Sequence, residues 1–96
     1  MQKYQHKIEK GKIPMATNDK IMFAIMSGTQ DSNIRFSDLQ KILSVLGFHY
    51  RVKGDHFIYW NENVDEIVNI QPDGSKAKAY QVKQIRNLIY QYELEV

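Results

Sequence analysis

Near the middle of the chain lies the stretch His49-Tyr50-Arg51-Val52-Lys53-Gly54-Asp55-His56-Phe57-Ile58-Tyr59-Trp60, which predicts a β-hairpin. Gly54 and Asp55 separate two runs that are rich in aromatic and β-branched residues. Glycine at the first central position is what a two-residue type II′ turn requires. With this loop, Lys53 faces His56 across the hairpin, and the side chains of each strand alternate between two surfaces.

The two surfaces of the predicted hairpin differ in chemistry. One is apolar and aromatic, as a hydrophobic core requires, and carries Tyr50, Val52, Phe57 and Tyr59. The other is mainly polar and carries His49, Arg51, Lys53, His56, Ile58 and Trp60. An imidazole beside two cations can bind and attack a phosphodiester, so this pattern favours a nuclease.

Three helices are predicted around the hairpin. The first follows a cap at Asn18 or Asp19 and runs to Gly28. The second begins with a capping box over residues 37–40 and ends at Gly47, with Phe48 folding back onto Leu43. Its buried stripe consists of Leu39, Ile42, Leu43 and Leu46. The last helix spans residues 80–92, where apolar side chains recur at helical spacing.

A third strand is predicted at residues 66–70, and the sequence Pro72-Asp73-Gly74-Ser75 ends it. The order is therefore helix, helix, three strands, helix. Each helix has one apolar stripe and the sheet has one apolar face. This pattern predicts an α+β fold in which a three-stranded antiparallel sheet carries the helices on one face and leaves the other open.

Composition bounds the function without naming it. At 96 residues and a net charge of +2, the chain is expected to form one domain that is only mildly basic. We expect a flexible tail over residues 1–14, which holds His6, and a single domain over 15–96; Met15 is an alternative start. The absence of cysteine suits a reducing cytoplasm. The apolar run at residues 21–26 is too short to cross a membrane.

Neither a metal site nor a cofactor is expected. His49 and His56 are the only central histidines, and no His-Glu-x-x-His spacing or glycine-rich phosphate loop occurs. Cations do gather around the start of the last predicted helix, at Lys76, Lys78 and Lys83.

Several of these segments together resemble the HicA toxins of bacterial toxin–antitoxin pairs. They are Ser37-Asp38-Leu39, Leu46-Gly47-Phe48, the run from Arg51 to Phe57, an Ile-rich strand and a Lys-containing last helix, over residues 34–92. The resemblance implies a fold like the double-stranded-RNA-binding domain (αβββα), to which the helix predicted before Gly28 is an addition at the N-terminus. In that family a Gly-Ser-His turn carries the essential histidine, which corresponds to His56. This chain has Asp55 where Ser is common, and Asn69-Ile70-Gln71-Pro72 where the family has a shorter Val-Pro.

The resemblance implies a cytoplasmic endoribonuclease that cleaves mRNA without a metal, inhibits translation, and is covered on its His56 face by a HicB-like antitoxin. His56 would be the general base, and Arg51 and Lys53 would hold phosphate. The complementary acid stays open between His49, a tyrosine and a lysine. Lys76, Lys78 and Lys83 would follow the RNA backbone, and Trp60 would stack on an unpaired base.

Two other functions fit the same residues. One is a non-catalytic RNA-binding module that uses the cations only for docking. The other is an adaptor that binds a protein through Ile58 and Trp60, because exposed apolar side chains usually mark a partner.

Overall fold

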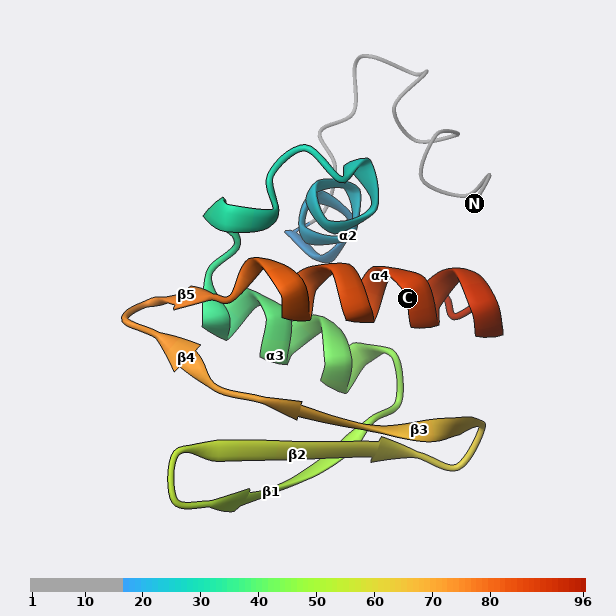
Figure 1. Ribbon diagram of the computed structural model, residues 1–96. Helices are drawn as coiled ribbons and strands as arrows, with labels where there is room; N and C mark the ends of the chain where they lie inside the picture. The colour runs from blue at the N-terminus through green and yellow to red at the C-terminus, as the bar shows by residue number, and fades with distance from the viewer. Residues whose placement is uncertain (1–16) are drawn as a thin grey trace.

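The computed structural model describes residues 17–96 (Figure 1). The predictions for the 1–14 tail, His6 and Met15 lie outside these residues. The elements follow in the order α2 (Thr17–Ser27), η1 (Asp31–Asn33), α3 (Phe36–Val45), β1 (His49–Lys53), β2 (His56–Asn61), β3 (Val64–Ile70), β4 (Pro72–Asp73), β5 (Lys76–Ala77) and α4 (Ala79–Tyr92).

The hairpin has the predicted register. Lys53 pairs with His56 and Arg51 with Ile58, and β3 adds to β2 to give an antiparallel sheet of order β1-β2-β3. Gly54 has φ = 64° while Asp55 keeps a negative φ, as a type II′ turn requires. Beyond Tyr59, the pairing of β2 with β3 shifts register at a bulge that ends at Asn61.

The helices cover one face of this sheet. Figure 1 shows α3 and α4 above the strands and α2 beyond them, and α2 packs against both other helices. The fold is therefore α+β and resembles the double-stranded-RNA-binding domain, as predicted. The largest fully buried side chains are Tyr59, Met22, Ile25, Leu39, Ile42, Leu43, Ile70, Ile85, Ile89, Gln81, Val68 and Val82.

The prediction that the whole inner surface of the hairpin is core is wrong for β1. Phe57 and Tyr59 of β2 pack inward, but Tyr50 and Val52 remain 50% and 53% exposed. β1 is an edge strand, and the helices lie mainly over the other two strands. Tyr50 instead stacks on the Tyr59 ring, with centroids 5.0 Å apart.

The capping box predicted for α3 is also wrong. The helix begins at Phe36, and no side chain caps it. Its first N–H is satisfied by backbone from another part of the chain, because the Phe36 N–H donates to the Ser75 carbonyl at 3.0 Å. At the other end, Gly47 has φ = 95°, and the N–H of Phe48 donates to the Leu43 carbonyl at 2.9 Å. This is the predicted left-handed stop, a Schellman motif.

The segment that was predicted only to end the third strand forms a second, two-stranded sheet. β4 pairs with β5 across a turn at Gly74, so Pro72 starts a strand, where its missing N–H is tolerated. β5 in turn contacts the segment before α3, and the Ala77 N–H donates to the Ile34 carbonyl at 2.9 Å.

α2 begins at Thr17, so Asn18 and Asp19 lie inside its first turn and the cap predicted at one of them is wrong. The remaining helix and strand bounds lie within about two residues of those predicted.

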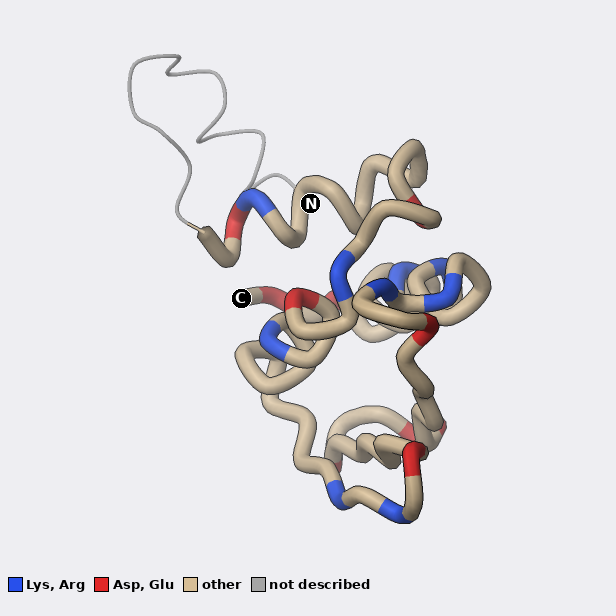
Figure 2. The backbone as a smooth tube through the Cα atoms, turned by 90° about the vertical axis from the view of Figure 1, so that its left-hand side faces the viewer, with Lys and Arg blue, Asp and Glu red and all other residues tan. Residues whose placement is uncertain are grey.

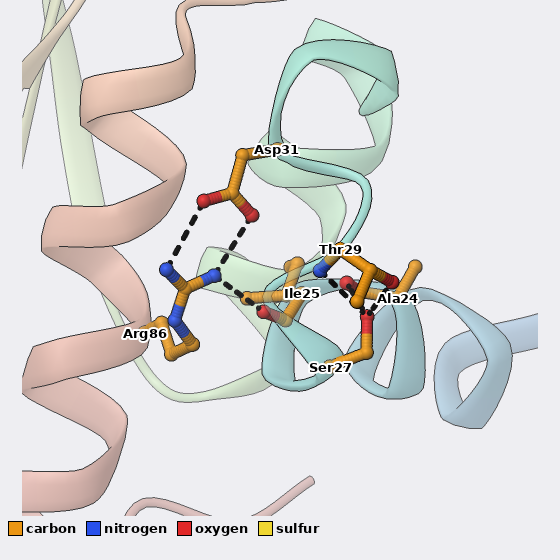
Figure 3. Close-up of polar contacts among 6 residues, drawn as sticks. All are labelled: Ala24, Ile25, Ser27, Thr29, Asp31 and Arg86. Carbon is orange, nitrogen blue, oxygen red and sulfur yellow. Dashed lines mark hydrogen bonds and ion pairs between the residues drawn. The ribbon is translucent and has the colours of Figure 1, made fainter.

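An ion pair joins the N-terminal region to α4 (Figure 3). The Arg86 guanidinium donates to both oxygens of Asp31, at 2.8 and 3.0 Å, and to the Ile25 carbonyl at 3.0 Å. The Arg86 side chain is 14% exposed and that of Asp31 22%. Hydrogen bonding by Arg86 lowers the pKa of the Asp31 carboxyl. Through these bonds Arg86 of α4 holds both α2, at Ile25, and η1, at Asp31.

Within residues 17–96, no helix is long and apolar enough to cross a membrane.

Candidate active site and nucleic-acid interface

The surface of the sheet opposite the helices, which we call the open face, carries the predicted catalytic group. The strand register places His49, Arg51, Lys53, His56, Ile58, Trp60, Ile67 and Asn69 there. Arg51 and Lys53 are exposed, and the His56 side chain is 45% exposed. His56 and Lys53 flank the turn as direct partners, so their Cβ atoms are separated by about 5 Å.

Both ring nitrogens of His56 have acceptors nearby. Nδ1 lies 3.0 Å from the carboxamide Oδ1 of Asn69 on β3. Nε2 lies 3.8 Å from Oδ1 of Asp55, and that carboxylate also accepts a hydrogen bond from Nε2 of Gln71 at 3.2 Å. The turn and β3 thus contribute polar groups on two sides of one accessible imidazole.

A second group of side chains lies toward the opposite end of β2. The rings of His49 and Trp60 have centroids 5.6 Å apart, and His49 Nε2 is 3.2 Å from Glu62. The pKa of the Glu62 carboxyl is lowered, first by a hydrogen bond from its own backbone N–H and further by His49. Trp60 is four residues from His56, or about 13 Å along an extended strand.

The separation between the His49 and His56 ends of the hairpin limits which group can act as the complementary acid. His49 pairs with Trp60, so it is too far along the strands to reach the same bond as His56. Tyr50 and Tyr59 belong to the surface that faces the helices, and burial raises the pKa of Tyr59. Of the groups that the sequence leaves open, Lys53 is the one placed directly beside His56.

The predicted RNA-binding lysines outside the hairpin do not lie on the open face. Lys76 is in β5, Lys78 is the residue before α4, and Lys83 is in the second turn of that helix. Lys76 donates to Oδ1 of Asn33 at 3.3 Å. Figure 2 shows Lys and Arg (blue) on the strands and, separately, at the level of the helices. The start of α4 and the β1–β2 turn nevertheless lie toward the same end of the molecule (Figure 1).

No three His, Cys, Asp or Glu side chains are arranged to hold a metal ion in the part of the chain that the structure describes.

A family model for the HicA toxin of bacterial toxin–antitoxin systems matches residues 36–91. The chain belongs to the HicA toxin family. Members of this family are known as mRNA interferases. The match begins with α3 and includes the whole sheet, His56 and nearly all of α4, whereas α2 and η1 precede it. Searches of curated proteins and of solved structures gave no match.

The structure also shows neighbours of His56 that sequence reasoning did not assign. Alternation along β3 predicts Asn69 on the same face, but not its contact with the imidazole. His56 lies diagonally across from Asn69, whose direct partner is Ile58. Diagonal side chains meet only when they lean along the strands, and the alternation pattern does not report that lean.

Proposed function

We propose that this HicA family member is a toxin that cleaves mRNA as a metal-independent endoribonuclease, with His56 as its general acid/base. The observation that carries the proposal is the position of His56. Its ring is accessible on the open face inside the family match, beside Lys53 and close to Arg51 in the register. Family membership alone does not identify the catalytic residue. The arrangement of an imidazole beside two cations supports His56, because RNA cleavage needs a base, an acid and a cation for the phosphate.

The proposed reaction uses the 2′-hydroxyl of the substrate as nucleophile. His56 removes its proton, the 2′-oxygen bonds to phosphorus, and the bond to the 5′-oxygen breaks. Lys53 protonates the leaving 5′-oxygen, while Arg51 binds the phosphate oxygens as negative charge develops on them. The products are a 2′,3′-cyclic phosphate and a free 5′-hydroxyl. After accepting the proton, the ring is an imidazolium, and Asp55 at 3.8 Å attracts it.

Single-stranded RNA fits the remaining groups of the open face. Trp60 is 38% exposed and presents a ring on which an unpaired base can stack. Outside the open face, Lys76, Lys78 and Lys83 would hold the RNA backbone where it passes from the β1–β2 turn toward the helices, aided by the positive end of the α4 dipole.

We also propose that a HicB-like antitoxin inhibits the toxin by covering the open face. Family membership implies an antitoxin partner. Trp60 at 38% and Ile67 at 65% exposure are apolar side chains on a polar surface, which is where a partner is expected to bind. An action on mRNA and its regulation by such a partner would take place in the cytoplasm.

The test is cleavage of end-labelled mixed-sequence RNA by purified protein in EDTA. The parent should cleave and leave 2′,3′-cyclic phosphate ends. His56→Ala should lower the rate by about two to four orders of magnitude with RNA affinity unchanged. Asn87→Ala is the control, because Asn87 is exposed on α4 and lies outside the open face; its rate should stay within about threefold.

Three results would redirect the proposal. Equal RNA binding by parent and His56→Ala with no cleavage by either would favour the non-catalytic RNA-binding module. No RNA binding at all would favour the protein adaptor. Cleavage that EDTA abolishes would contradict the metal-independent mechanism.

A further inference from the structure

We propose that Asn69 is a positioning residue that holds His56 in the tautomer with hydrogen on Nδ1 and so presents a bare Nε2 to the RNA. The inference rests on the proposed function for its catalytic meaning, but its structural content is independent of cleavage. It starts from the 3.0 Å contact between His56 Nδ1 and the Asn69 carboxamide oxygen.

As a hydrogen bond, this contact selects which ring nitrogen carries hydrogen. A carboxamide oxygen only accepts hydrogen bonds, so the nitrogen facing it must be the donor. In a neutral imidazole the other nitrogen is then unprotonated. That nitrogen, Nε2, is the one that can remove a proton from a 2′-hydroxyl. Free histidine favours hydrogen on Nε2, so without Asn69 most neutral rings would present the wrong atom to the substrate.

The backbone of Asn69 is held in place by the core. Its neighbours Val68 and Ile70 point to the other side of β3 and are both fully buried. Asn69 also pairs with Ile58 of the central strand β2. The carboxamide therefore projects from a strand position whose two neighbours are anchored in the core, toward the ring of His56 at the start of β2. An acceptor anchored in this way can orient the ring.

The polar neighbours of Nε2 leave it accessible. Asp55 is 3.8 Å away, which is longer than a hydrogen bond, and its oxygen already accepts one from Gln71. The side chain of Asp55 is 75% exposed. A substrate hydroxyl can therefore approach Nε2, and Asp55 interacts strongly with the ring only once a second proton has arrived.

The first test is nitrogen NMR of the His56 ring in RNA-free protein at a pH where the ring is neutral. The parent should show the Nδ1–H tautomer. Asn69→Leu, which keeps the size but removes the acceptor, should shift the ring toward the Nε2–H tautomer. Asn69→Asp, which keeps an acceptor oxygen, should retain the parent tautomer. Asn87→Leu, which removes an exposed carboxamide on α4, should change nothing.

The second test is the rate of RNA cleavage. Asn69→Leu should lower kcat about three- to tenfold with KM unchanged, the range that one neutral hydrogen bond supplies, and Asn69→Asp should restore most of the loss. The inference is overturned if the parent ring is in the Nε2–H form, or if Asn69→Leu changes neither tautomer nor kcat. A parent that shows the Nδ1–H tautomer but cleaves no RNA would instead refute the proposed function.

Discussion

Replacing Asp31 by asparagine would remove the charge that faces Arg86 while keeping the side-chain shape. Arg86 would keep its bond to the Ile25 carbonyl but lose a carboxylate that accepts two hydrogen bonds, at 2.8 and 3.0 Å. Exposed ion pairs contribute about 0–1 kcal/mol, whereas breaking a buried pair costs about 3–5 kcal/mol. At 14% and 22% exposure this pair lies between these cases. We therefore expect Asp31→Asn to lower the free energy of unfolding by about 2 kcal/mol.

The effect should depend on pH with a defined sign. Because Arg86 lowers the pKa of Asp31 below its ordinary value of 3.8, the native state favours the ionised carboxylate. The stabilisation is present above pH 3.8 and is lost as pH falls through the lower native-state pKa. The deficit of Asp31→Asn should therefore be largest near neutral pH and shrink in acid.

Urea unfolding followed by circular dichroism, repeated at several pH values, measures the free energy of unfolding and its pH dependence. Asp73→Asn is the control, because Asp73 is an exposed carboxylate in β4; it should change the free energy of unfolding by less than about 0.5 kcal/mol. The reasoning fails if Asp31→Asn matches this control at neutral pH, or if its deficit stays constant down to the acid limit of folding.

Three further outcomes are expected. Gly47→Ala should lower the free energy of unfolding by about 1–2 kcal/mol in the same urea experiment, because φ = 95° strains any residue with a Cβ. The cost is backbone strain and not a clash, since a Cβ on residue 47 would lie 3.5 Å from its nearest neighbour, Asn61 Nδ2. Glu66→Gln should bring the pKa of Tyr92 back toward 10.0, because the Tyr92 hydroxyl donates to Glu66 at 2.6 Å; NMR titration of the ring would show it, and an unchanged pKa would contradict that contact. Trp60 is the only tryptophan, so saturating RNA should change the protein's intrinsic fluorescence, and an unaltered spectrum would argue against stacking.

Local patterns predicted the part of the fold that carries the site. The type II′ turn at Gly54 and the alternation of side chains determine the register of β1 and β2, so the positions of Lys53 and His56 followed from neighbouring residues alone. Gly47 predicted the end of α3 for the same reason, because its left-handed conformation is a property of one residue.

Contacts between distant segments account for what was missed. Ser37 matches a capping pattern, yet the carbonyl of Ser75 satisfies the start of α3, and no local rule reports that approach. Pro72 indicates a break, yet it begins the strand that brings this carbonyl into place. At the site, the alternation along β3 is enough to place Asn69 on the open face, but its bond to His56 depends on how two side chains lean across the sheet.

The uncovered edge strand β1 affects whether copies of this protein associate with one another in solution. β1 presents unpaired backbone groups beside the exposed side chains of Tyr50 and Val52, a combination that promotes edge-to-edge aggregation of sheets. Arg51 and Lys53 alternate with these apolar side chains, so two such edges brought together antiparallel would set like charges against each other. We therefore expect the two cations proposed to act on the phosphodiester to keep copies of the protein apart as well, and neutralising both should make the protein prone to precipitation.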